Sequence, residues 1–72
     1  MIDHDYAADV VPAMDSYNIV VSLRTEASLD ADQTATLARN ERHLGLKMAA
    51  PAFVTALTAE QKTQIEALEI TL

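Results

Sequence analysis

The chain has 72 residues, of which 11 are acidic and 5 are basic, and its formal net charge is −6. A chain of this length forms at most one domain and buries about 60% of its unfolded surface, so its core is small. The negative charge argues against a protein that neutralises nucleic-acid phosphates. The lack of cysteine excludes disulfide-stapled scaffolds and thiolate metal sites. Leu, Ile, Val and Phe together make up 18 residues, which argues against disorder.

Residues 1–15 are expected to be an acidic, frayed leader, and residues 16–72 a single small domain. The first 23 residues contain four Asp and no Lys or Arg. A secretory signal begins with basic residues and continues into an apolar run, and a membrane-spanning helix needs about 20 apolar residues. The sequence has neither pattern, so we predict a cytoplasmic protein that does not contact a membrane.

Residues 17–25 show the alternation that is typical of a β-strand. Apolar and polar residues alternate there with Val20 as the exception, and the apolar set is Tyr17, Ile19, Val21 and Leu23. This period of two, rich in β-branched residues, predicts a half-buried strand. A helix from Asp15 towards Thr25 is the alternative, which the consecutive β-branched residues disfavour.

Residues 30–48 are expected to form a helix. Asp30 and Gln33 have the spacing of a capping box, which begins a helix. One apolar stripe recurs at i, i+7 and i+11, and it consists of Leu37, Leu44 and Met48. Because Met48 completes this stripe, we expect the helix to continue through Gly45 at a cost of about 1 kcal/mol.

Pro51 ends this helix and begins a connector. Residues 49–57 are expected to contain one short helical turn that carries Phe53 and Leu57. Thr58 and Gln61 then form a second capping box. The last helix is therefore predicted at residues 59–68.

The predicted fold class is α+β, mainly α, with an N-terminal strand at about 17–25 and an antiparallel helical pair at about 30–48 and 59–68. A short C-terminal strand at 68–72, paired with the first strand, is an alternative because apolar residues alternate there. A core this thin gains stability from association. We therefore predict a homodimer formed through the first strand or through the helical stripe.

Basic residues gather on one face of the helix at 30–48. At about 100° per residue they span roughly a third of its circumference, opposite the apolar stripe; they are Arg39, Arg42, His43 and Lys47. This face is a candidate docking patch for an acidic protein surface or a phosphate, and the simpler interpretation is a solvated helix face. Nucleic acid is not expected as a partner because the remaining acidic surface would repel it.

The acidic leader is a second candidate surface, formed by Asp3, Asp5, Asp9 and Asp15. Its Asp-His-Asp run contains metal-ligand types, but the residues that follow lack the Gly and Glu of a calcium loop. We therefore predict neither a metal nor a cofactor.

Catalysis would need a serine or threonine activated by His4 or His43, since the chain has no Cys. Ser16, Ser22 and Ser28 have no catalytic motif around them. We therefore predict that the protein is not an enzyme.

Two short runs of residues carry a family resemblance. Ala38-Arg39-Asn40-Glu41-Arg42-His43-Leu44 contains the pattern Arg-Asn-x-x-His-Leu, and Leu57-Thr58-Ala59-Glu60-Gln61 begins the next helix. Together they resemble small uncharacterised proteins encoded in tailed phages and prophages, over residues 35–68. In that group bulky aromatic residues follow the first helix, whereas here small residues precede Phe53. The resemblance implies a virion-assembly or accessory role and no active site.

We therefore expect a non-enzymatic structural or interaction protein, phage- or prophage-encoded, located in the cytoplasm or the virion. Its partner is a protein, including a second copy of itself, and its contact residues are Arg39, Arg42, His43 and Lys47. The alternative is a small acidic regulator or inhibitor that binds a basic protein through the leader aspartates.

Overall fold

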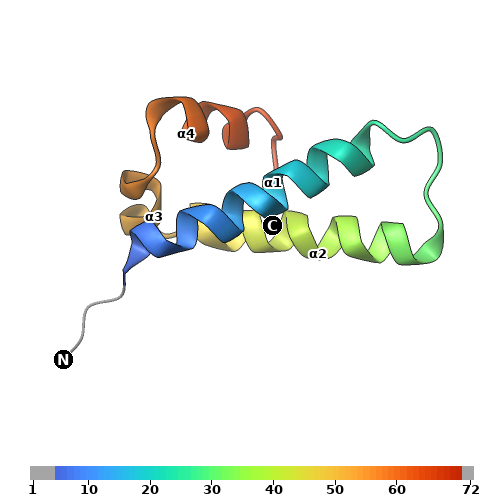
Figure 1. Cartoon of the computed structure of the whole chain (residues 1–72), viewed down its shortest axis with the longest axis horizontal. Coiled ribbons are helices and arrows are strands. Elements are labelled where there is room, and N and C mark those ends of the chain that lie inside the picture. Colours follow the sequence, from blue (N-terminus) through green and yellow to red (C-terminus); the bar gives the residue numbers. More distant parts are fainter. Residues whose placement is uncertain (1–4, 71–72) are drawn as a thin grey trace.

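The computed structural model describes residues 5–70, and their secondary structure is helical. A 3-10 helix, η1 (Tyr6–Asp9), leads into α1 (Val10–Arg24), and α2 (Ala31–Met48), α3 (Pro51–Ala56) and α4 (Ala59–Glu66) follow. Figure 1 shows α1 and α2 as an antiparallel hairpin, with α3 and α4 beside one half of it. The described residues contain no strand, so the predicted α+β class is wrong.

The strand predicted at 17–25 is instead part of α1. Ile19 and Val21 are 39% and 36% exposed, whereas Val20, the exception to the alternation, is fully buried. The buried face of α1 recurs with the helical spacing i, i+3 and i+7 and consists of Ala13, Ser16 and Val20. These side chains are small, so α1 can pack closely on α2, and this packing overrides the β propensity of the segment. The chain adopts the helical alternative, which begins earlier than expected, at Val10.

Together, η1 and the first turns of α1 include most of the predicted leader. Pro12 is the third residue of the helix, where a backbone N–H has no acceptor within the helix, so the ring is tolerated there. Tyr6 and Val10 pack against the core, while Val11 is 68% exposed. The predicted boundary between leader and domain, at residues 15 and 16, therefore falls inside α1.

The start and length of α2 are confirmed. The side chain of Asp30 accepts a hydrogen bond from the backbone N–H of Gln33 at 2.7 Å, and the Gln33 side chain accepts one from the N–H of Asp30 at 3.0 Å. The helix continues through Gly45 to Met48. A local capping signal and one apolar stripe were sufficient to predict this element.

The start of α4 is also confirmed, and its end differs. Thr58 and Gln61 exchange the two hydrogen bonds of a capping box, at 3.1 Å and 2.9 Å. The helix ends at Glu66, two residues before the predicted end, and Glu69 then adopts a left-handed backbone conformation with φ of 53°. Residues 69 and 70 are irregular, so the alternative C-terminal strand does not begin there; residues 71 and 72 lie outside the described part.

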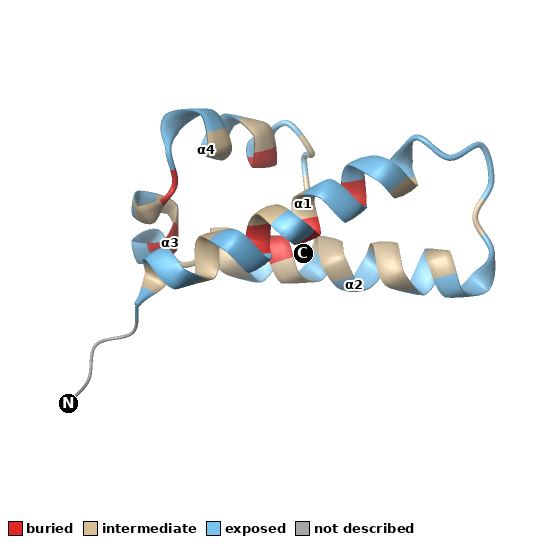
Figure 2. Ribbon diagram, in the orientation of Figure 1, coloured by how far each residue is buried: buried red, intermediate tan, exposed pale blue. Residues whose placement is uncertain are grey.

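The main helical pair is α1 with α2, not the predicted pair at 30–48 and 59–68. The buried apolar residues come from all four helices and their connections: Ala13, Val20, Leu44, Phe53, Leu57 and Ile65. Figure 2 shows most of them in the half of the hairpin that α3 and α4 accompany. The strand proposed as one dimer contact is absent from the described residues. Of the helical stripe, Leu44 is fully buried within the chain, while Leu37 and Met48 are partly buried against the core, so a dimer through the stripe stays a prediction.

Candidate functional site

The structure divides the four basic residues predicted to form one surface. His43 and Lys47 contact α1 and η1, whereas Arg39 and Arg42 are exposed. The rotation of α2 about its axis is set by the packing of Leu44 in the core. This rotation turns part of the predicted face inward.

His43 is half-buried and joins the two helices of the hairpin. Its Nδ1 atom lies 2.8 Å from the Oγ of Ser16, at hydrogen-bonding distance. Ser16 is only 6% exposed, and no carboxylate among the described residues is hydrogen-bonded to His43. This serine–histidine pair therefore has the geometry of a buried polar link between helices, satisfied on both sides.

Lys47 is held by an ion pair. Its Nζ atom donates to the Oδ2 of Asp9 at 3.1 Å, and this bond joins the end of α2 to η1. Both side chains are partly buried, which reduces their exposure to a partner. Because Asp9 pairs with Lys47, its carboxylate is less available to the predicted acidic surface.

The other leader aspartates do not gather into one site within the described residues. Asp5 accepts a hydrogen bond from the N–H of Ala7 at 3.1 Å and begins η1. Asp15 is exposed on α1, and Asp3 lies outside the described residues, as does His4. Between residues 5 and 70, no group of three or more His, Cys, Asp or Glu residues could hold a metal ion.

Arg24 makes a contact that the sequence did not indicate. Its guanidinium pairs with the carboxylate of Glu41 on α2 and donates to the carbonyl oxygen of Leu68 at 2.7 Å. One side chain of α1 thus holds both α2 and the segment after α4. The partners are 17 and 44 residues away in sequence, which is beyond the reach of spacing arguments.

Arg39, Arg42 and Leu46 form what we call the outward face of α2. Arg39 donates a hydrogen bond to the hydroxyl of Thr36 at 3.3 Å, and within residues 5–70 neither arginine forms an ion pair. Leu46 is 54% exposed and lies between the two arginines on the helix circumference at about 100° per residue. An exposed leucine flanked by two unpaired guanidinium groups is a composition found at protein interfaces, where arginine is enriched.

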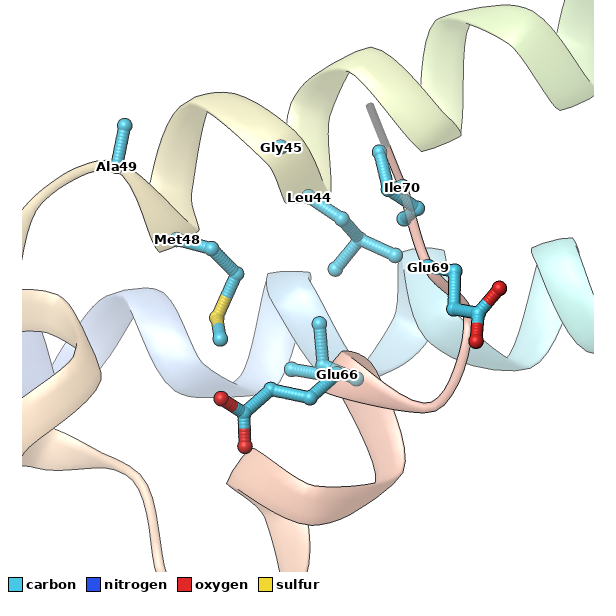
Figure 3. A pocket seen from close by; sticks show the side chains of 8 residues that line it. Leu44, Gly45, Met48, Ala49, Glu66, Glu69 and Ile70 are labelled. Atoms are coloured by element: carbon cyan, nitrogen blue, oxygen red, sulfur yellow. The ribbon is translucent and has the colours of Figure 1, made fainter. Parts of the chain in front are cut away.

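A groove of about 540 Å³ lies between α2 and the segment that contains the end of α4. Its lining consists of Leu44, Gly45, Met48, Ala49, Ile65, Glu66, Glu69 and Ile70, and we call it the α2–α4 groove. Figure 3 shows Leu44 and Met48 extending from α2 towards the C-terminal segment, with Glu66 extending to the Met48 side of the groove and the carboxylate of Glu69 directed away from both apolar side chains. The groove therefore has an apolar floor and an acidic edge.

Sequence reasoning missed this groove because its walls come from segments about 20 residues apart along the chain. The available signal was the position of Glu66 and Glu69 beside the apolar residues Ile65 and Ile70. This pattern places two acidic residues next to apolar ones, but it does not show that α2 forms the opposite wall of the groove.

No family model matches this chain, and no match was found among curated proteins or solved structures. The resemblance to phage-encoded proteins over residues 35–68 therefore stays a prediction. Within residues 5–70, no helix combines the length and the apolar character needed to cross a bilayer.

Proposed function

We propose that this chain is a non-enzymatic interaction protein that binds an acidic protein surface through the outward face of α2. The observation that supports this proposal is the pairing pattern of its cations. Arg24 and Lys47 are bound to carboxylates of the same chain, while Arg39 and Arg42 have no such partner among the described residues. Unpaired guanidinium groups beside an exposed leucine suit an acidic and partly apolar partner.

The proposed site is smaller than the surface predicted from the sequence. His43 and Lys47 hold α2 against α1 and η1, so their role in the proposal is to orient α2. Leu46 takes their place as a contact residue. The burial of Ser16 supports a structural role for the Ser16–His43 pair, in keeping with a non-enzymatic protein.

On the resemblance of residues 35–68, we extend the proposal to an accessory or virion-assembly role for a phage or prophage protein, in the cytoplasm or the virion. An acidic regulator that binds a basic protein is the competing function. Asp9 already pairs with Lys47, which weakens the acidic surface on which that alternative depends.

Quantitative affinity capture tests the proposal. Tagged wild-type chain is compared with Arg39→Glu/Arg42→Glu and with Lys62→Glu, a reversal of an exposed lysine on α4. We expect the wild type and Lys62→Glu to capture the same acidic proteins. The amount of these proteins captured by the double variant should be lower by more than about tenfold.

Purified candidates from this capture are then bound directly to each variant by isothermal titration calorimetry. Equal binding of the wild type and the Arg39→Glu/Arg42→Glu variant would overturn the proposal. Loss of binding on Asp15→Lys instead would favour the acidic regulator.

A further inference from the structure

The α2–α4 groove and the outward face of α2 are complementary in charge and polarity. The groove has apolar side chains with Glu66 and Glu69 at its edge, and the outward face has Leu46 between two arginines. Neither glutamate forms an ion pair within the described residues. Two carboxylates and two guanidinium groups are thus available on one molecule.

These two surfaces lie on different sides of α2. Leu46 is two positions from Leu44 and two from Met48, so at about 100° per residue it points roughly opposite to the side chains that line the groove. One copy therefore cannot place its own Leu46 in its own groove. The complementary surface has to come from another molecule.

The small core supplies a reason for association. Among residues 5–70, six apolar residues are buried, and one of them is an alanine. In chains of this size a single core gives only a small free energy of unfolding, and association commonly adds to it. Filling the groove would cover the exposed apolar parts of Met48 and Ile70, which are only partly buried in one chain.

We propose that the α2–α4 groove of one copy binds the outward face of a second copy, with Leu46 in the groove and Arg39 and Arg42 beside Glu66 and Glu69. This inference rests on the proposed function and names the acidic partner surface as that of the same chain. The contact joins two different surfaces, so it is heterologous: one copy keeps a free outward face and the other keeps a free groove. Assembly then continues head to tail beyond a dimer.

Sedimentation velocity over a concentration series tests this proposal. We expect the weight-average mass of the wild type to rise steadily above the 7.8 kDa of one chain. Arg39→Glu/Arg42→Glu and Glu66→Lys/Glu69→Lys should each weaken association by more than about tenfold, because each places like charges in contact. An equimolar mixture of the two variants should associate again, since the reversed charges are then opposite.

The Glu66→Lys/Glu69→Lys variant distinguishes a specific contact from an effect of overall charge repulsion between copies. Reversing two acidic residues changes the net charge from −6 to −2, so a model based on net charge predicts stronger association, whereas our proposal predicts weaker association. Asp15→Lys/Glu26→Lys is the matched control, since it carries the same net charge and changes exposed residues away from both surfaces. It should associate at least as strongly as the wild type.

Two results would overturn the inference. One is a wild-type chain that stays monomeric at millimolar concentration, and the other is an association that Glu66→Lys/Glu69→Lys leaves unchanged. If either occurs while Arg39→Glu/Arg42→Glu still loses a captured acidic protein, the proposed function stands and the self-association fails. If the arginine variant loses neither kind of binding, both fail. Circular dichroism of each variant confirms that it is folded before it is scored.

Discussion

The Oγ of Ser16 and the Nδ1 of His43 lie 2.8 Å apart and join α1 to α2 across the interior of the hairpin. Ser16 sits on the buried face of α1 between Ala13 and Val20. The pair therefore interrupts an otherwise apolar contact with one directional bond. Such a bond favours one register of the two helices over neighbouring registers, because a shifted pair would leave buried polar atoms without partners.

Ser16→Ala is expected to destabilise the fold by about 1–3 kcal/mol, since it leaves a half-buried ring nitrogen without its partner. Ser22→Ala, at an exposed position on the same helix, is the control and should change stability by less than about 0.5 kcal/mol. Urea unfolding followed by circular dichroism measures both. Equal midpoints for the two variants would show that the bond contributes nothing.

Leu44 and Leu46 are two residues apart on α2, so the same substitution at each position compares a core residue with a surface residue. Leu44 is fully buried and Leu46 is 54% exposed. We expect Leu44→Ala to cost about 2–5 kcal/mol, enough to unfold much of so small a domain, and Leu46→Ala to cost less than about 0.5 kcal/mol. Thermal unfolding distinguishes them. Similar losses for both would contradict the orientation of α2.

Thr58→Ala removes the side-chain acceptor for the N–H of Gln61 and should cost about 1 kcal/mol. The loss should appear locally, as faster amide hydrogen exchange in α4 (Ala59–Glu66) than in α2. Thr55→Ala is the control, because its hydroxyl bonds to the carbonyl of Pro51 within α3 and caps no helix start. Exchange in α4 that is unchanged by Thr58→Ala would show that packing alone holds this helix.

Arg24→Lys keeps the positive charge but loses the planar group that reaches Glu41 and the carbonyl of Leu68 together. A cost of about 1 kcal/mol is expected. It should be accompanied by faster exchange of the Leu68 and Glu69 amides, which bond to the last turn of α4. Glu41→Gln removes the ion pair and keeps the Leu68 contact, so it should leave that exchange near the wild-type rate. If Glu41→Gln instead accelerated exchange of these amides more than Arg24→Lys did, the role given to Arg24 would be ruled out.

Local signals predicted the helix starts at Asp30 and Thr58 correctly, because a capping box is complete within four residues. The same sequence misled at residues 17–25, where the alternation suited a strand and a helix was formed. The apolar side chains of α1 occur all around the helix, including the exposed Val11 and Ile19, so no single period identified the buried face. Val20 becomes a buried residue only through the packing of α1 on α2.

The candidate site was predicted in part. The residues on α2 were correctly placed on one helix, and Arg39 and Arg42 are exposed as expected of a docking face. The inward turn of His43 and Lys47 depends on partners 27 and 38 residues away. Such pairs cannot be predicted from spacing within one helix, which is why the surface predicted from the sequence includes two residues that the structure turns towards α1 and η1.

The α2–α4 groove has walls from residues 44–49 and 65–70, and the side chain that fastens the second wall belongs to α1, at Arg24. No single helix contains all three parts. A synthetic peptide copied from any one helix would therefore present half a groove at most. Any ligand that enters it serves as a reporter of the folded state, since recognition is lost as soon as the C-terminal segment separates from the hairpin.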